Sequence, residues 1–201
     1  MILGATQWST NGAMIADVHR LGYITDLDRV LDPTYGRGRW WTEYLPQHLT
    51  AHDLKTDGVD FRRLPEAAGS FDVVAFDPPY IAPGGRTTST TPDFNDRYGL
   101  VDVPKTPDSV TALILAGVVE FHRVLRPDGL LLLKCMNYVS GGRYRPAAYD
   151  VLRGAEQIGF RLVDELVHLR HPGPQPSRDR QHHARRNYSL LFVLRRDRAV
   201  R

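Results

Sequence analysis

The sequence predicts an α/β protein built on a mostly parallel sheet. Strand-like and helix-like segments alternate along the 201 residues, and the segments 71–76 and 130–136 are mainly apolar rather than alternating. Mainly apolar strands are typical of parallel sheets that helices cover on both faces. The last two strand-like segments, 160–169 and 188–194, have no helix between them, so we expect them to pair antiparallel.

The first quarter of the chain shows the alternation in short steps. Apolar residues recur at helical spacing over 11–22, where Gly22 is a plausible end of a helix. A short apolar segment, 29–31, then leads into a glycine-rich turn, and 40–45 is expected to continue from that turn as a helix. Residues 48–51 are a further strand candidate.

The second half adds two longer helices. Apolar residues three and four apart predict a helix over 108–124, with Asp108 or Ser109 as its N-cap. A second helix is expected over 146–158, closed by Gly159. Since no internal repeat or long linker divides the chain, we expect a single domain over 1–201.

Composition narrows the class of protein. Hydrophobic residues make up 42% and charged residues 24%, as in ordinary soluble globular proteins. The start of the chain does not resemble a signal peptide, and no apolar run is long enough to span a membrane. The single cysteine, Cys135, excludes an internal disulfide and is expected to pack in the core. These features predict a cytoplasmic protein.

Positive charge is concentrated at one end. The whole chain carries +3, whereas residues 170–201 contain nine Arg and two Asp. Such a basic region is expected to face a polyanion, because phosphate contacts supply most non-specific affinity for nucleic acids. The alternative is a solvated basic tail.

The predicted strand ends carry the residues that point to chemistry. In open α/β sheets, ligands bind outside the carboxyl ends of the strands. The first strand runs into Asp32-Pro-Thr-Tyr-Gly-Arg-Gly38, where Gly36 and Gly38 would let the backbone approach a ligand closely. The third glycine of the dinucleotide-binding fingerprint is missing, and a plain tight turn is the alternative.

Two further positions are candidates for contacts to a nucleoside. Asp53 follows the next strand, and a carboxylate there can accept hydrogen bonds from a ribose diol. Asp60 and Phe61 place an acceptor beside an aromatic ring, which suits an adenine. The alternatives are a surface turn at Asp53, and an ordinary loop acid beside a core phenylalanine.

The strand 71–76 ends in Asp77-Pro78-Pro79-Tyr80. An exocyclic amino group of a nucleobase is a poor nucleophile, because its lone pair is conjugated with the ring. A carboxylate and a nearby carbonyl can accept its N–H groups and localise that lone pair, and prolines fix where the carbonyl points. The tyrosine offers a surface on which a flipped base can stack. A strand terminator is the alternative explanation.

Residues 32–38, followed by FDVVAFDPPY at 71–80, resemble the class I S-adenosylmethionine-dependent methyltransferases that modify base amino groups. The resemblance implies a Rossmann-like fold with a seven-stranded, mostly parallel sheet and a C-terminal antiparallel strand pair. It implies S-adenosyl-L-methionine as cofactor and a catalytic role for Asp77, Pro78, Pro79 and Tyr80. The cofactor-binding residues that it implies are Asp32, Thr34, Tyr35, Gly36, Gly38, Asp53, Asp60 and Phe61, with the segment 8–11 as a further contact.

An aspartate at the first position of the DPPY motif is typical, in this family, of enzymes that methylate the N6 amino group of adenine in DNA. The alternatives are N4-cytosine in DNA, a base in tRNA or rRNA, and a catalytically silent nucleic-acid-binding module. From a length of 201 residues we expect no separate target-recognition domain. Recognition is therefore expected from a mobile substrate loop at 81–107 and a basic loop at 170–187.

The residues expected to bind the nucleic acid lie in these two loops. They are Arg86, Arg178, Arg180, His183, Arg185, Arg186 and Asn187. No metal site is expected, because the adjacent histidines 182 and 183 lack further ligands at suitable spacing. Lys134, near a strand end, could face a phosphate or simply cap the strand.

Overall fold

The structure is a computed structural model that describes residues 3–79, 104, 106–169, 182–184 and 186–198. The basic loop is therefore described only in part, and nearly all of the predicted substrate loop lies outside the described residues.

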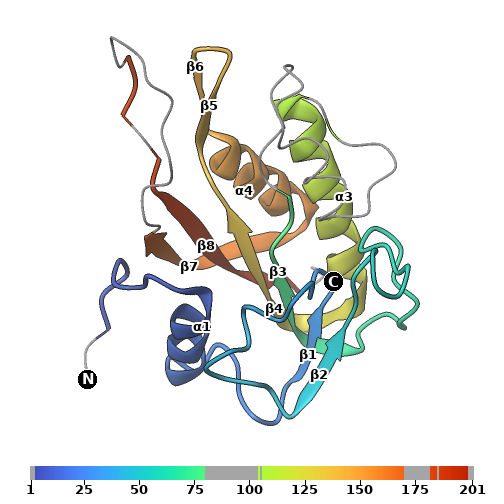
Figure 1. Cartoon of the computed structure of the whole chain (residues 1–201). Helices are drawn as coiled ribbons and strands as arrows, with labels where there is room; N and C mark the ends of the chain where they lie inside the picture. The colour runs from blue at the N-terminus through green and yellow to red at the C-terminus, as the bar shows by residue number, and fades with distance from the viewer. Residues whose placement is uncertain (1–2, 80–103, 105, 170–181, 185, 199–201) are drawn as a thin grey trace.

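A twisted sheet forms the middle layer of the molecule (Figure 1). Its first four strands in sequence, β1 to β4, run parallel, and β8 and β7 are antiparallel to their neighbours. This confirms the mostly parallel sheet with a C-terminal antiparallel pair. The order across the sheet is β2 (His48–Ala51), β1 (Arg29–Asp32), β3 (Phe71–Phe76), β4 (Leu125–Cys135), β8 (Tyr188–Arg196) and β7 (Phe160–Leu169).

This sheet has six strands within the described part of the chain, where seven were expected. The segment 52–70, between β2 and β3, consists of turns instead of a further edge strand. Its composition accounts for this, because aspartates, glycines and a proline interrupt every apolar run in it.

The expected helix at 40–45 is also absent: these residues form turns and bends. Trp40 and Trp41 are both buried there, with exposures of 4% and 6%. Their indole N–H groups donate to carboxylates at the ends of two strands, Asp77 and Asp32. These long-range contacts favour a turn that directs both rings inward over the local preference for a helix.

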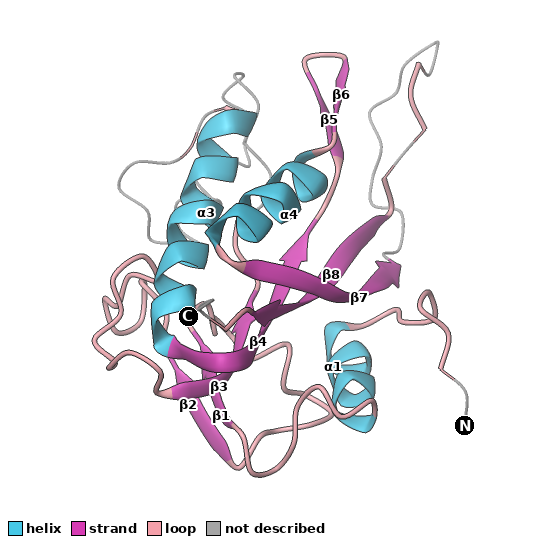
Figure 2. Cartoon of the chain, turned by 180° about the vertical axis from the view of Figure 1, so that it is seen from behind, coloured by secondary structure: helices cyan, strands magenta, loops and turns pink. Residues whose placement is uncertain are grey.

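Helices cover both faces of the sheet (Figures 1 and 2). On one face lies α1 (Asn11–Arg20), and on the other lie α3 (Pro107–Val124) and α4 (Ala147–Ile158). Side chains of β3 alternate between the two layers: Val74 packs in the cluster that contains α3, and Val73 packs in the cluster that contains α1. Each face thus has its own apolar core.

The helix ends agree with the predicted glycines and differ at one cap. Gly22 and Gly159 have φ values of 80° and 112°, which a side chain would oppose. The N-cap of α3 is Thr106, and not Asp108 or Ser109 as expected, because Thr106 and Ser109 hydrogen-bond each other's backbone in a capping box.

A small hairpin stands apart from the sheet. Strands β5 (Tyr138–Ser140) and β6 (Arg143–Arg145) pair antiparallel around Gly141 and Gly142, whose φ values are 57° and 72°. Two consecutive residues with positive φ match the tight turn of a two-residue hairpin. The hairpin projects away from the body (Figures 1 and 2).

Candidate active site

The carboxyl ends of β1, β2, β3 and β4 border a cavity of about 1070 Å³. This is the edge at which open α/β sheets bind ligands. The start of α1, the glycine-rich turn after β1, and the segment after β2 form its walls. Predicted site residues that line it are Asp32, Thr34, Tyr35, Gly36, Asp53, Phe61, Asp77 and Pro79.

Asp32 ends β1 and is only 4% exposed. Its carboxylate accepts the indole N–H of Trp41 at 2.8 Å and the backbone N–H of Thr34 at 2.9 Å. Burial raises the pKa of Asp32 to about 7, although these hydrogen bonds oppose the shift, and the nearby charge of Asp77 adds to it. A cation bound beside Asp32 would stabilise its charged form.

The turn after β1 depends on its glycines. Gly36, at φ 54°, donates its N–H to the Asp53 carboxylate at 3.2 Å and so joins the ends of β1 and β2. A Cβ atom on Gly38 would lie 2.6 Å from the Tyr35 hydroxyl oxygen, so the tyrosine can pack over this turn only because residue 38 is glycine. Gly38 therefore shapes the cavity without lining it.

The structure separates the pair that was expected to contact an adenine. Phe61 lines the cavity and packs edge-on against Phe76, with ring centroids 5.0 Å apart. The Asp60 carboxylate does not line the cavity: it forms an ion pair with Arg62 at 2.5 Å. The Arg62 guanidinium donates to both Asp60 oxygens, so this carboxylate already has a partner that would compete with an amino group.

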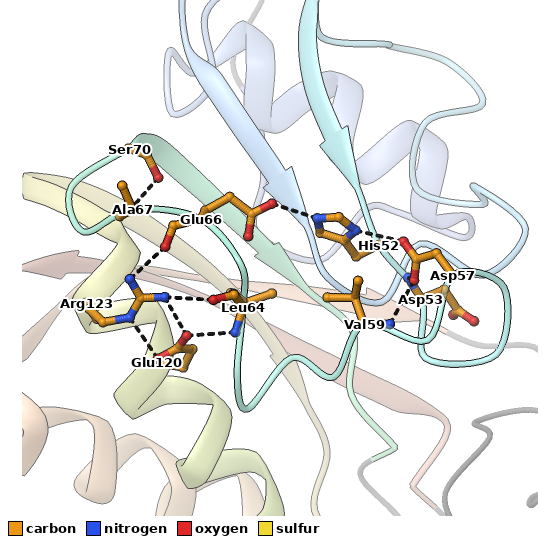
Figure 3. A network of polar contacts seen from close by, with 10 residues as sticks. All are labelled: His52, Asp53, Asp57, Val59, Leu64, Glu66, Ala67, Ser70, Glu120 and Arg123. Carbon is orange, nitrogen blue, oxygen red and sulfur yellow. Dashed lines mark hydrogen bonds and ion pairs between the residues drawn. The ribbon is translucent and has the colours of Figure 1, made fainter.

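The turns of 52–70 are held by a polar network (Figure 3). His52 contacts Asp57 through one ring nitrogen and Glu66 through the other, both at 2.7 Å. Burial lowers the pKa of His52, but the two carboxylates outweigh burial and raise the pKa overall. Arg123 of α3 binds Glu120 and the carbonyl oxygen of Glu66. The network connects this wall of the cavity to the helix behind it.

Asp77 lies directly after β3 and is held from several directions. Its carboxylate accepts the indole N–H of Trp40 at 3.1 Å and lies 3.7 Å from the Lys134 ammonium. Its backbone N–H donates to the Thr34 hydroxyl. Lys134, only 3% exposed, also donates to Asn11 at 2.6 Å. A carboxylate fixed in this way needs little rearrangement to receive a hydrogen-bond donor.

The rest of the motif is described only in part. Pro78 and Pro79 are buried, and Pro79 lines the cavity. Tyr80 lies outside the described residues.

The described residues of the basic loop lie beside the β5–β6 hairpin and do not line the cavity. His183 contacts the carbonyl oxygen of Gly142 at 2.8 Å, and the Arg186 guanidinium lies 4.8 Å from the ring centroid of Tyr144. Asn187 is half-buried just before β8. The other predicted substrate-binding residues, Arg86, Arg178, Arg180 and Arg185, lie outside the described residues.

Sequence reasoning missed several residues of the cavity. Trp40 and His168 had no predicted role, and for Lys134 capping of the strand was favoured slightly over a contact to phosphate, yet all three line the cavity. A lysine in an otherwise apolar strand was a usable signal, whereas nothing in the local pattern pointed to Trp40. Cys135, the next residue, is buried in the core as predicted, and burial raises the pKa of its thiol.

Within the described ranges, no group of three or more metal-ligating side chains occurs. None of the described helices has the length and apolar character that a membrane span requires.

A scan against protein-family models found no match, and neither did a search of curated proteins. Solved structures do resemble the chain. A proposed methyltransferase, BH2331 from Bacillus halodurans C-125, aligns with a TM-score of 0.56 and 15% identity over 93% of this chain and 100% of its own. The 1,6-didemethyltoxoflavin-N1-methyltransferase of Burkholderia thailandensis, solved with S-adenosylhomocysteine, aligns with a TM-score of 0.51 and 18% identity over 94% and 77%.

A weaker likeness is to TTHA0409 of Thermus thermophilus, a proposed DNA modification methylase, with a TM-score of 0.46 and 17% identity. That alignment covers 71% of this chain and 52% of the other, so the chain spans about half the length of TTHA0409. Together, the two closer likenesses show that this chain has the fold of class I S-adenosylmethionine-dependent methyltransferases.

Proposed function

We propose that this protein is an S-adenosylmethionine-dependent methyltransferase that acts on the exocyclic N6 amino group of adenine in DNA. The observation that carries the proposal is the Asp77 carboxylate, held by Trp40 and Lys134 at the end of β3 on the wall of the cavity. The motif around Asp77 supports an amino group as acceptor, and its aspartate supports adenine.

The walls of the cavity suit the cofactor. Asp53 would accept the ribose hydroxyls, and Phe61 would pack against the adenine ring, since both line the same cavity as the glycine turn. Buried Asp32 would face the positively charged methionine end, where a cation would favour its ionised form. The cofactor supplies an electrophilic methyl group on a sulfonium sulfur.

In this proposal, Asp77 and the carbonyl oxygen of Pro78 accept the two N–H groups of the target amine, and Tyr80 stacks on the flipped base. Hydrogen bonding from both N–H groups localises the nitrogen lone pair and directs it at the methyl group. The nitrogen would gain a bond to the methyl carbon while the bond from that carbon to the sulfonium sulfur breaks and the sulfur keeps the electron pair. The nitrogen would also lose a proton, which the Asp77 carboxylate can accept. Trp40 and Lys134 keep the carboxylate in position throughout.

The test supplies methyl-labelled cofactor with unmethylated genomic DNA and, separately, with total RNA. Each nucleic acid is then digested, and the labelled nucleoside is identified. Label in N6-methyladenine from DNA is the expected result. Label in N4-methylcytosine or in an RNA nucleoside would contradict the assigned substrate while keeping the chemistry. If no nucleoside is labelled and the cofactor does not bind, the proposal that the protein is this enzyme is contradicted.

A variant pair then tests the role of Asp77. Asp77→Asn should lower the rate of methyl transfer by about a hundred- to a thousand-fold while cofactor affinity changes little. Asp72→Asn is the matched control, because it makes the same change at the opposite end of β3, where Asp72 pairs with Arg29 and Arg126. Equal loss in both variants would contradict a catalytic role for Asp77.

A further inference from the structure

We propose that the β5–β6 hairpin (residues 138–145) is a nucleic-acid-binding arm of this protein, with Arg143 and Arg145 neutralising phosphates and Tyr144 stacking on a base. This inference rests on the proposed function, because it assigns the surface that holds the polynucleotide around the target base. None of these three residues was predicted as a substrate contact.

The hairpin combines a fixed base with an exposed tip. At its base, Tyr138 is 6% exposed and packs with Met136 and Ala147, while the Asn137 side chain accepts the backbone N–H of Ala148 at 3.1 Å. Toward the tip, Tyr144 is 41% exposed. A rigid base limits the conformational entropy that binding through the tip would cost.

The charge of the hairpin has one sign. Residues 138–145 contain two arginines and no acidic residue. The described part of the basic loop adds to it, since Arg186 lies over the Tyr144 ring and His183 contacts Gly142 at the turn. Guanidinium groups beside an exposed aromatic ring are the combination with which proteins bind the backbone and bases of single strands.

The hairpin is also close to the site along the chain. It begins three residues after Cys135, where β4 ends, and the preceding residue, Lys134, lines the cavity and lies 3.7 Å from Asp77. Figure 1 shows it continuing beyond the carboxyl end of β4, and Lys134 near that end lines the cavity. A strand bound along the hairpin would therefore lie at the end of the sheet whose strand ends border the cavity.

Binding can be measured without catalysis, by fluorescence anisotropy of labelled single-stranded DNA, RNA of the same sequence and duplex DNA at several salt concentrations. Combining Arg143→Ala with Arg145→Ala should weaken binding and reduce the slope of log affinity against log salt by about 1.4 to 1.8, as expected for two lost phosphate contacts. The probe that binds most tightly shows whether the hairpin prefers single-stranded DNA, RNA or duplex DNA.

The aromatic contact has its own signature. Tyr144→Ala should weaken binding about ten-fold with an unchanged salt slope, because stacking is not ionic, and Tyr144→Phe should bind as the wild type does. Arg198→Ala is the matched control: this arginine is 79% exposed in its side chain and pairs with Asp128, at the opposite end of β4. The affinity and the salt slope of the Arg198→Ala variant should stay within about two-fold of the wild-type values, because this surface charge lies away from the proposed binding arm.

Two results would overturn the inference. If the hairpin variants bind nucleic acid as tightly as the wild type and with the same salt slope, the proposed role of the hairpin is wrong. The labelled-methyl experiment can then still support the proposed methyltransferase activity. If the wild type binds none of the three probes, the arm and the polynucleotide substrate are both wrong, and methyl transfer to a small molecule would then show that the chemistry alone was assigned correctly.

Discussion

Neighbouring tryptophans serve two different carboxylates in this site. Trp40 donates to Asp77 at 3.1 Å, and Trp41 donates to Asp32 at 2.8 Å. The two indoles are chemically equivalent, but one carboxylate belongs to the proposed catalytic motif and the other to the proposed cofactor site. The same Trp→Phe substitution at the two positions therefore removes a hydrogen bond to a different carboxylate in each case.

We expect Trp40→Phe to lower kcat by about ten-fold or more with cofactor affinity nearly unchanged, because a hydrogen bond to a charged group contributes about 1.5–3 kcal/mol. Trp41→Phe should instead weaken cofactor binding and leave kcat at saturating cofactor nearly unchanged. Steady-state kinetics and calorimetric titration of both variants measure this split. The same kinetic defect in both would contradict separate roles.

Asp32 predicts a pH dependence of stability. Its pKa rises from 3.8 to about 7 on folding, so between these values the folded state binds the extra proton. The stability of the cofactor-free protein should therefore fall as pH rises from about 4 to about 7 and stay lower above that range, by a total contribution of about 4 kcal/mol.

Asp32→Asn removes this titration. Denaturant unfolding of both proteins should show the variant gaining on the wild type as pH rises through that window, by up to about 4 kcal/mol. Taking the difference cancels groups that titrate equally in both, including His52, whose raised pKa also makes stability fall as pH rises. A difference that stays constant over the window would show that Asp32 is ionised throughout.

Among the secondary-structure elements, α3 positions the cavity wall through a glycine. A Cβ atom on Gly117 would lie 2.8 Å from the Phe61 ring and 3.3 Å from Phe121. The helix thus tolerates its least favourable ordinary residue in order to let Phe61 pack against it and face the cavity. In α4, Gly154 is a comparable helical glycine, but the three atoms nearest to its Cβ atom would all belong to the side chain of Leu115.

Gly117→Ala should displace the Phe61 ring and weaken cofactor binding about ten-fold, a change of about 1.4 kcal/mol. Its gain in helix propensity, about 1 kcal/mol, would be offset by the displaced ring. Gly154→Ala should leave cofactor affinity unchanged, because the side chain that it would displace, Leu115, does not line the cavity. Calorimetric titration of both variants tests this, and equal affinities would show that Phe61 does not contact the cofactor.

Over the whole molecule, the cavity is formed by both faces of the sheet. Trp40 packs in the apolar cluster on the α1 side, and Phe61 packs in the cluster on the α3 side, yet both line the cavity. A ligand between them would contact both layers at once. Binding should therefore stabilise the fold as a unit.

We expect S-adenosylhomocysteine at about one hundred times its Kd to stabilise the protein by about 2.7 kcal/mol, raising Tm by about 5–10 °C. NAD at the same concentration is the control, since the glycine turn lacks the third glycine of the dinucleotide fingerprint. Thermal denaturation measures both. A shift with NAD and none with S-adenosylhomocysteine would contradict the assigned cofactor.

Local patterns in the sequence were enough to predict the layered α/β fold, the antiparallel pair of β7 and β8, and the strand ends that meet at the cavity. Apolar segments, and glycines with positive φ such as Gly36, determine the local structure of the residues next to them. The carboxyl ends of parallel strands lie at one edge of a sheet by geometry. For the same reason the sequence predicts that Asp32, Asp53 and Asp77 lie near one another.

The partners of those carboxylates depended on tertiary structure. Trp40 is 37 positions from Asp77, and Lys134 is 123 positions from Asn11, so no local periodicity reports either contact. Burial of the two indoles outweighed the helical tendency of 40–45, and the Arg62 ion pair drew Asp60 away from the cavity. Such contacts are stabilised only once the folded chain excludes water around them, which is why the pattern of single residues could not determine them.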